Sequence, residues 1–216
     1  MPKRPTVIVL AAGRGSRFLG DQHKLEQPLG ASTVLGTTLR HALGSGLPVC
    51  VVTTDALHEM ACRSIAARDV VVLAAVGSEA SEPLGMGYSI AAGVSATSGA
   101  DGWVVMPGDM PMVQPGTLQA VARELNRSPV AYAQYRGRRG HPVGFGSELF
   151  TELATLTGDE GARRLIARYP AQGVDVDDPG VLIDVDNLQD LEEVRLKRID
   201  AASWPDDTGS AFLPSR

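Results

Sequence analysis

Cysteine is scarce in this chain of 216 residues, which contains only Cys50 and Cys62. The two cysteines do not form a C-x-x-C pair, so neither a disulfide scaffold nor a structural zinc site is expected. So little cysteine is typical of a protein kept in a reducing compartment, and we therefore predict a cytoplasmic location.

Basic residues do not outnumber acidic ones. Twenty Lys and Arg residues stand against 25 Asp and Glu residues, which gives a formal net charge of −5 at pH 7. A general positive field that would attract nucleic acid or an anionic membrane surface is therefore absent, while a local basic pocket is compatible with this balance. We expect no nucleic-acid partner and no membrane partner.

Long hydrophobic runs are missing as well, because no apolar segment approaches the roughly 18 residues that span a bilayer. The apolar residues 6–12 follow Lys3 and Arg4, as in a secretion signal. They end in Gly13 and a basic segment, however, and not in a small-residue cleavage site. We interpret residues 7–10 as a first buried strand.

What the chain does contain is an alternation of short, β-branched apolar runs with helical patterns. Continuous apolar runs are typical of strands that are covered on both faces. The alternation predicts a single-domain, Rossmann-like, three-layer α/β/α fold with a mainly parallel sheet. The expected strands are 7–10, 49–53, 70–75, 103–106, 130–133 and 181–185, and the expected helices are 33–43, 56–67, 86–96, 115–127 and 188–199. We assign the domain to residues 1–199 and the aperiodic residues 200–216 to a C-terminal tail.

The loop after the first expected strand combines glycines with cations. Gly13 and Gly15 allow successive backbone N–H groups to face one anion, and Arg17 and Lys24 add positive charge, a combination that suits a triphosphate. The dinucleotide pattern G-x-G-x-x-G fails because residue 18 is Phe, and a P-loop fails because Asp follows Gly20. An ordinary glycine-rich turn with surface charges is the alternative.

A carboxylate follows the strand expected at residues 103–106. Asp109 lies between Pro107 and Pro111, which restrict the backbone and would present the carboxylate rigidly at a strand end. Mg²⁺ prefers one or two carboxylates with substrate phosphates completing its shell. The alternative is an aspartate that merely starts a turn by bonding its own backbone.

A second pair of carboxylates, Asp184 and Asp186, lies near the end of the domain. Alternation would place both on the same face of a short strand at 181–185. The alternative is that Asp186 or Asn187 caps the following helix.

Two further segments carry chemistry. Gly87 and Ser89 open a helix whose backbone donors would face a base or ribose. A serine-hydrolase elbow is not expected there, because Ala91 stands where G-x-S-x-G has its last glycine. Residues 136–142 form the one dense basic stretch, which is either a solvated hairpin tip or a site for an anionic second substrate.

With these residues in view, the sequence resembles the MobA/MocA-like nucleotidyltransferases, and among them the molybdenum cofactor cytidylyltransferases. The resemblance covers roughly residues 5–197 and implies a fold of the nucleotide-diphospho-sugar transferase type. Its marks, in order, are LAAGRGSRF with Lys24, GMGYS, PGDMP, GHPVGFG, LTGDEGAR and DVDNLQDL.

The resemblance also implies roles for individual residues. Mg²⁺ would be the cofactor, held by Asp109 and Asp186, with Asp184 as the substitute for the second ligand. Lys24, Arg17 and Asp109 would be catalytic, and His141 and Arg138 would face the acceptor substrate. The residues implied to contact the nucleotide are Leu10, Ala11, Ala12, Gly13, Gly15, Lys24, Gly87, Ser89 and Asp109.

The implied reaction moves a CMP group from CTP to the phosphate of molybdenum-loaded molybdopterin and releases pyrophosphate. Ala12 favours CTP, because relatives specific for guanine usually read LAGG at this point. A molybdoenzyme or its chaperone is a further expected partner. The alternatives are a guanylyltransferase or a transferase with another phosphate acceptor, an oxidoreductase on the same scaffold, and a non-catalytic cofactor carrier. The pair of carboxylate loops favours metal–triphosphate chemistry over the oxidoreductase.

Overall fold

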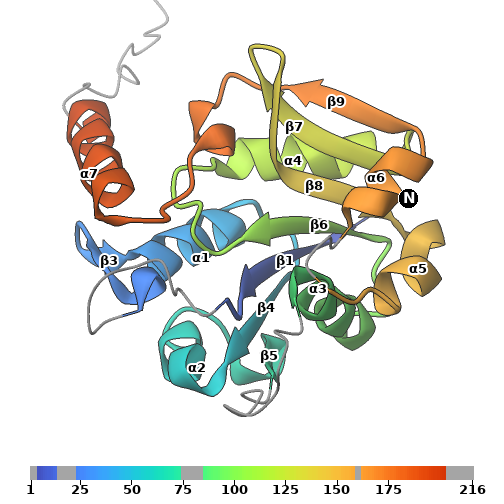
Figure 1. Ribbon diagram of the computed structural model, residues 1–216, viewed down its shortest axis with the longest axis horizontal. Coiled ribbons are helices and arrows are strands. Elements are labelled where there is room, and N and C mark those ends of the chain that lie inside the picture. Colours follow the sequence, from blue (N-terminus) through green and yellow to red (C-terminus); the bar gives the residue numbers. More distant parts are fainter. Residues whose placement is uncertain (1–3, 14–22, 74–84, 159–161, 203–216) are drawn as a thin grey trace, which may run out of the picture.

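A seven-stranded sheet forms the centre of the computed structural model, which describes residues 4–13, 23–73, 85–158 and 162–202. The strand order is β5-β4-β1-β6-β8-β7-β9, and helices lie on both faces (Figure 1). The strands are β1 (Thr6–Ala11), β4 (Val49–Thr54), β5 (Val70–Leu73), β6 (Gly102–Pro107), β7 (Val130–Tyr135), β8 (Arg138–Gly146) and β9 (Ala171–Asp175); β2 (Pro28–Leu29) and β3 (Ser32–Thr33) pair separately.

Strand direction divides the sheet at β6. Strands β5, β4, β1 and β6 are parallel to one another. Strand β8 is antiparallel to both β6 and β7, and β9 is parallel to β7. The prediction of a mainly parallel sheet is confirmed, and the reversal of β8 has one important effect: the start of β8 lies beside the carboxyl end of β6.

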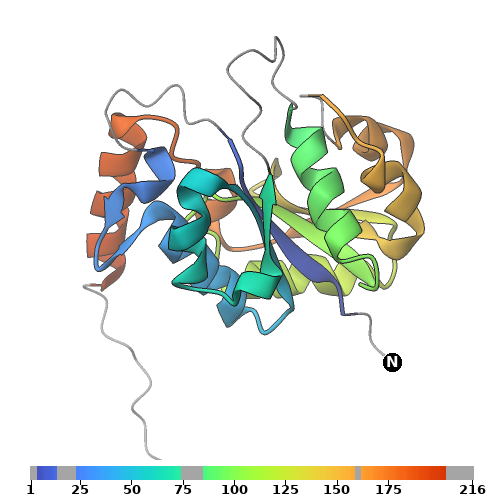
Figure 2. The same ribbon diagram turned by 90° about the horizontal axis from the view of Figure 1, so that it is seen from below.

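Two hydrophobic clusters, one on each face of the sheet, confirm the three-layer arrangement (Figures 1 and 2). In β1, Val7 and Val9 belong to one cluster and Ile8 to the other, because side chains alternate along a strand. The helices of the first layer are α1 (Val34–Gly44), α2 (Asp55–Cys62), α4 (Pro115–Glu124) and α7 (Leu188–Ala202); those of the second are α3 (Gly85–Ala96), α5 (Phe150–Ala154) and α6 (Arg163–Arg168). None of the described helices is long and apolar enough to cross a membrane.

Helix α3 packs unusually close to the sheet at Gly93. A Cβ at this position would lie 2.8 Å from Ile8 Cγ2 and 2.9 Å from Val52 Cγ2. The glycine therefore lets the helix axis approach β1 and β4, which fixes where the first turn of α3 lies relative to the carboxyl ends of those strands.

The strand expected at residues 181–185 is wrong. Pro179–Leu182 forms a 3-10 helix, η4, and residues 183–187 are extended chain outside the sheet. Four strands were not predicted, namely the two-residue strands β2 and β3 and, in the central sheet, β8 and β9. Strand β8 contains Pro142 and three glycines, and β9 contains Gly173, residues that are depleted in strands. Helix α2 ends at Cys62 rather than at residue 67, and α7 continues to Ala202. The remaining 3-10 helices are η1 (Lys24–Glu26), η2 (Ala67–Asp69) and η3 (Ser147–Leu149).

A buried carboxylate, Asp178, explains why the chain turns away from the sheet after β9. Only 5% of Asp178 is exposed. Its Oδ2 accepts hydrogen bonds from Gln114 N at 2.8 Å and Thr117 Oγ1 at 2.6 Å, and its Oδ1 accepts one from Gly180 N at 2.9 Å. The side chain thus ties η4 to the first turn of α4 and directs the following residues toward the end of β6.

We expect Asp178→Ala to lower the free energy of unfolding by about 2–3 kcal/mol, because buried donors on η4 and α4 would lose their acceptor. Urea denaturation of the whole chain measures this effect. The exposed neighbour offers a matched control, since Asp177→Ala should change the same quantity by less than about 0.5 kcal/mol. Equal denaturation midpoints for the two variants would contradict the anchoring role.

Candidate functional site

Three residues far apart in the sequence form an ionic cluster at the carboxyl end of β6. Lys24 begins η1, Asp109 follows β6, and Asp186 precedes α7. Lys24 Nζ donates to Asp109 Oδ2 at 2.6 Å and to Asp186 Oδ1 at 2.8 Å. Their side chains are 15%, 18% and 34% exposed, respectively, so the cluster is reachable from solvent but largely shielded from it.

Backbone hydrogen bonds fix Asp109 from two sides. Gly108 N donates to Leu10 O at 2.8 Å, which extends the pairing of β1 and β6, and Thr38 Oγ1 donates to Gly108 O at 2.9 Å. Val185 N donates to Asp109 O at 2.9 Å. This last bond replaces the predicted strand as the reason why Asp186 lies beside Asp109.

The first turn of α7 leaves the Asp186 carboxylate available to Lys24. Asn187 Oδ1 accepts from Asp190 N at 3.0 Å, while Asp190 Oδ2 accepts from the backbone N–H groups of Asp186 and Asn187. Asn187 therefore caps the helix. Lys24 bonds Asp186 and not Asp184, whose pKa is raised by partial burial and by the charges of Asp186 and Asp109.

Lys24 is held as a fixed positive charge. Burial alone would lower the pKa of Lys24, but the charge and hydrogen bond of Asp109, with the same contributions from Asp186, raise it above its ordinary value. The preceding residue positions it. His23 Nδ1 accepts from Leu25 N at 3.2 Å, so its Nε2 carries the proton and donates to Gly13 O at 2.9 Å. His23 thereby joins Lys24 to the chain that follows β1.

Two buried polar atoms near the cluster have no hydrogen-bond partner among the described residues, namely Asp109 Oδ1 and His141 Nδ1. Burial lowers the pKa of His141, Asp109 opposes this effect, and the charges of Arg139 and Arg163 add to it. A buried polar atom without a partner costs about 1–3 kcal/mol. Two such atoms in neighbouring side chains indicate a place where a ligand binds.

The donor set fits a hard divalent cation. Asp109 and Asp186 already share one positive charge, that of Lys24, and Asp109 Oδ1 is still unsatisfied. The described part of the chain contains no group of three or more His, Cys, Asp and Glu side chains that would enclose a metal ion. Two carboxylates match Mg²⁺, which usually takes one or two carboxylates and completes its shell with substrate phosphates and water.

The nucleotide-binding residues predicted from the sequence are only partly described. Ala12 and Gly13 follow the end of β1, next to the cluster, whereas Gly15 and Arg17 lie outside the described residues. Gly87 has a structural explanation: its N–H donates to Gly158 O at 3.0 Å, and a Cβ would lie 2.8 Å from Thr157 O. Nucleotide contacts by Leu10, Ala11 and Ser89 stay predictions.

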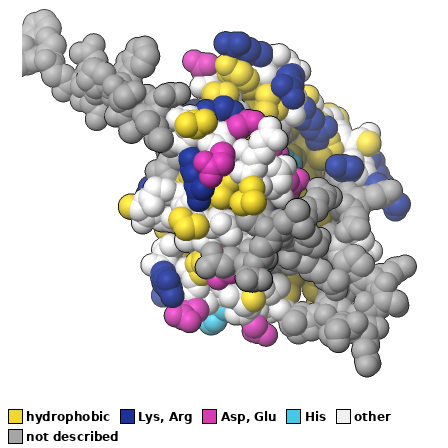
Figure 3. Space-filling model, turned by 60° about the vertical axis from the view of Figure 1, so that its left-hand side comes forward, with side chains coloured by type: hydrophobic (Ala, Val, Ile, Leu, Met, Phe, Trp, Pro, Cys, Tyr) yellow, Lys and Arg dark blue, Asp and Glu magenta, His cyan; other side chains and the backbone are white. Residues whose placement is uncertain are grey.

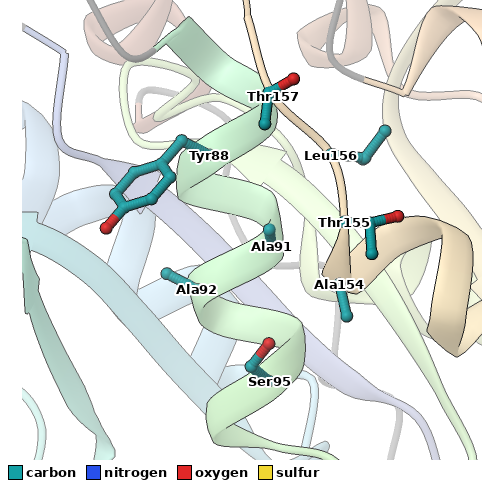
Figure 4. Close-up of a pocket in the computed structure, with 8 residues that line it drawn as sticks. All are labelled: Tyr88, Ala91, Ala92, Ser95, Ala154, Thr155, Leu156 and Thr157. Atoms are coloured by element: carbon teal, nitrogen blue, oxygen red, sulfur yellow. The ribbon is translucent and has the colours of Figure 1, made fainter.

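A shallow cavity of about 280 Å³ adjoins this part of α3 (Figure 4). Tyr88 and Ser95 lie on α3, and Leu156 and Thr157 lie on the segment after α5. Its lining holds no Lys, Arg, Asp, Glu or His side chain, so it does not belong to the charged cluster.

The structure does not bring the two predicted acceptor residues together. Arg138 and Arg139 lie on opposite faces of the sheet, because Leu182 beside Arg138 packs against the first hydrophobic cluster and Tyr132 beside Arg139 packs against the second. The Arg139 guanidinium lies 4.4 Å from the centre of the Tyr132 ring, whereas Arg138 lines a cavity of about 330 Å³ with Tyr135 and Leu182. Arg139 and Arg163, which the sequence analysis did not single out, are the two arginines whose charges act on His141.

Known proteins share this arrangement of elements. The purine catabolism protein PucB of Bacillus subtilis is 31% identical over 208 residues, covering 87% of this chain and 94% of PucB. The crystal structure of Rv0371c from Mycobacterium tuberculosis H37Rv has a TM-score of 0.75 and 30% identity, covering 89% of this chain and 98% of that one. Its complex with manganese has a TM-score of 0.73 and 28% identity, covering 91% and 100%.

The sequence model of the MobA-like NTP transferase domain matches residues 7–174, a region that contains Lys24, Asp109 and His141. Asp186 lies beyond this match, although the hydrogen bond to Lys24 makes it part of the same cluster. Since the match spans well over half of the chain, the protein belongs to the MobA-like NTP transferase family and is a nucleotidyltransferase.

Proposed function

We propose that this nucleotidyltransferase moves a CMP group from CTP to the terminal phosphate of molybdopterin and releases pyrophosphate. The observation that carries the proposal is the bridging of Asp109 and Asp186 by Lys24 at the carboxyl end of β6, beside the unsatisfied Asp109 Oδ1. Two carboxylates that already bind the ammonium group of Lys24 would also attract a metal ion. With the glycine-containing loop after β1 beside them, they would form a site for a metal–triphosphate complex.

The bond changes need little covalent help from the protein. An oxygen of the acceptor phosphate forms a new bond to the α-phosphorus of CTP. The bond from that phosphorus to the bridging oxygen breaks, and its electron pair leaves with pyrophosphate. Because the acceptor phosphate is already an anionic nucleophile, the chain has to bring two anions together and offset their repulsion.

The residues divide this task. Asp109 and Asp186 would hold a divalent cation, Mg²⁺ in our proposal, whose charge would neutralise phosphate oxygens when bound. Lys24 supplies a positive charge from the same place, and Arg17 and the N–H groups after β1 would hold the triphosphate. Negative charge builds up on the leaving pyrophosphate as the bond breaks. Lys24 would therefore stabilise the transition state more strongly than the ground state. A molybdoenzyme or its chaperone would receive the product.

The similarity to PucB, a protein named for purine catabolism, favours a second candidate, in which the same chemistry uses a different nucleotide or acceptor. Pyrophosphate release separates the candidates. With CTP and molybdopterin it supports the first proposal; release that requires another pair of substrates supports the second. NAD(P)H consumption would indicate an oxidoreductase, and molybdopterin binding without turnover would indicate a carrier.

Ala12 leads us to expect faster pyrophosphate release with CTP than with GTP at equal concentration, with molybdopterin as acceptor and Mg²⁺ present. A melting-temperature panel of CTP, GTP, ATP, UTP and NADPH gives an independent ranking of affinity. Faster turnover with GTP would overturn the assignment of the base while leaving the transfer chemistry intact.

We expect Asp109→Asn to reduce turnover by orders of magnitude, because an amide is a much weaker ligand for a hard cation than a carboxylate. The melting temperature should change little, since the substitution conserves shape and a partly exposed ion pair contributes only about 0–1 kcal/mol. Asp186→Asn should behave similarly, and Asp184→Asn, which alters a carboxylate that does not bond Lys24, is the matched control. Full activity in Asp109→Asn would sink the metal assignment.

We expect Lys24→Ala to lower kcat by a factor on the order of 10²–10³, with a smaller change in the affinity for CTP. Lys24→Arg should restore only part of the rate, since a planar guanidinium does not replace a point charge between two carboxylates. Steady-state kinetics and CTP titration measure the two effects separately. Weaker CTP binding with unchanged kcat would make Lys24 a docking residue instead.

A further inference from the structure

Arg139 and Arg163 converge on His141 from two different elements. Arg139 lies two residues before His141 on β8, and its guanidinium lies over the ring of Tyr132, which packs against the second hydrophobic cluster and so marks that face of the sheet. Arg163 begins α6, which packs on that face through Leu165. Both guanidinium groups lie close enough to act electrostatically on the His141 ring.

This place adjoins the ionic cluster. Val105 of β6 pairs with Val143 of β8 in an antiparallel ladder, so the residues just before Val143, His141 among them, run alongside the end of β6, the strand that leads to Asp109. The Asp109 carboxylate lies near enough for its charge to oppose the lowering of the His141 pKa by burial. An anion held at His141 would therefore lie beside the proposed nucleotide site and not within the loop after β1.

Neither arginine is neutralised within the described part of the chain, where no ion pair joins Arg139 or Arg163 to a carboxylate. Among the described residues, both guanidinium groups therefore keep their charge available to an anion beside the half-buried His141 ring. Lys and Arg side chains do gather locally despite the acidic total, as the upper right of Figure 3 shows for one face.

We propose that Arg139 and Arg163, together with His141 Nδ1, form the subsite that binds the phosphate group of the acceptor. The inference rests on the proposed function and names the substrate class at this point as a phosphate monoester. Guanidinium groups bind such an anion through paired N–H donors. Stacking on Tyr132 holds the plane of Arg139 before the ligand arrives, which reduces the ordering that binding requires.

Arg138 provides a matched control within the same strand. It differs from Arg139 by one position and has the same charge, but it lines the cavity on the opposite face with Pro179 and Ile183. Arg138, Arg139 and Arg163 are all exposed, so truncating any one of them should leave the fold intact. Melting temperatures of the three alanine variants check this.

The test is a calorimetric titration of inorganic phosphate into the wild-type chain and the variants Arg139→Ala, Arg163→Ala and Arg138→Ala. We expect the first two variants to bind phosphate at least about tenfold more weakly, and Arg138→Ala to bind within about twofold of wild type. Equal losses for Arg138→Ala and Arg139→Ala, or no loss for Arg139→Ala, would overturn the subsite.

A second titration identifies which phosphate the subsite takes. The protein is first saturated with Mg²⁺ and an α,β-methylene analogue of the triphosphate that stabilises it most. Continued binding of inorganic phosphate supports an acceptor subsite, whereas its loss would show that the arginines hold the nucleotide instead and would overturn the proposal.

Kinetics then separate this inference from the proposed function. With CTP and molybdopterin, Arg139→Ala should raise the KM for molybdopterin about tenfold and leave the KM for CTP unchanged. Normal pyrophosphate release with an unchanged KM for molybdopterin would reject the subsite alone. Arginine-dependent phosphate binding without any pyrophosphate release from these substrates would reject the proposed function alone.

Discussion

The structure depends on one electrostatic requirement, which is that two half-buried carboxylates cannot both stay ionised side by side without a cation between them. Lys24 meets this requirement for Asp109 and Asp186. The lysine is brought there by a short 3-10 helix that begins immediately after His23, and His23 is in turn bonded to the chain leaving β1. Sequence segments separated by more than 80 residues are thus joined through a single ammonium group.

Backbone contacts on both sides of Asp109 fix the positions of the residues in the ionic cluster. Close approach at Gly108 allows β6 to continue its bonding with β1 up to the residue before Asp109. On the other side, Asp178 anchors η4 to α4, and Val185 then bonds the carbonyl of Asp109. Asp178, a buried carboxylate with purely structural partners, therefore helps to position the half-buried carboxylates of the ionic cluster.

Much of this architecture could be predicted from the sequence, because a parallel strand that is buried on both faces appears as a continuous run of apolar residues. Residues 7–10, 49–53 and 103–106 are continuous apolar runs, and each became a central strand. The strands of the central sheet that were missed, β8 and β9, are rich in glycine or polar residues and take their places through pairing with neighbours, which a local pattern does not record. Asp109 and Lys24 were recognised from their loops, but their mutual contact depends on tertiary bonds such as that of Val185 to Asp109. The expectation that both His141 and Arg138 face the acceptor came from the resemblance alone, and the placement of Arg138 and Arg139 on opposite faces of β8 depends on tertiary contacts that no local pattern records.

The reversed direction of β8 also determines where insertions could be accommodated during evolution. The turn between β7 and β8 opens at the same edge of the sheet as the end of β6, yet only β8 touches β6. Insertions at Arg136 and Gly137 would lengthen the rim of the site without shifting the register of β1 and β6, in which Asp109 is set. The β7–β8 turn can therefore change in length while the β1–β6 register that sets Asp109 is kept. Related proteins could in this way alter the surface around the site without disturbing the ionic cluster.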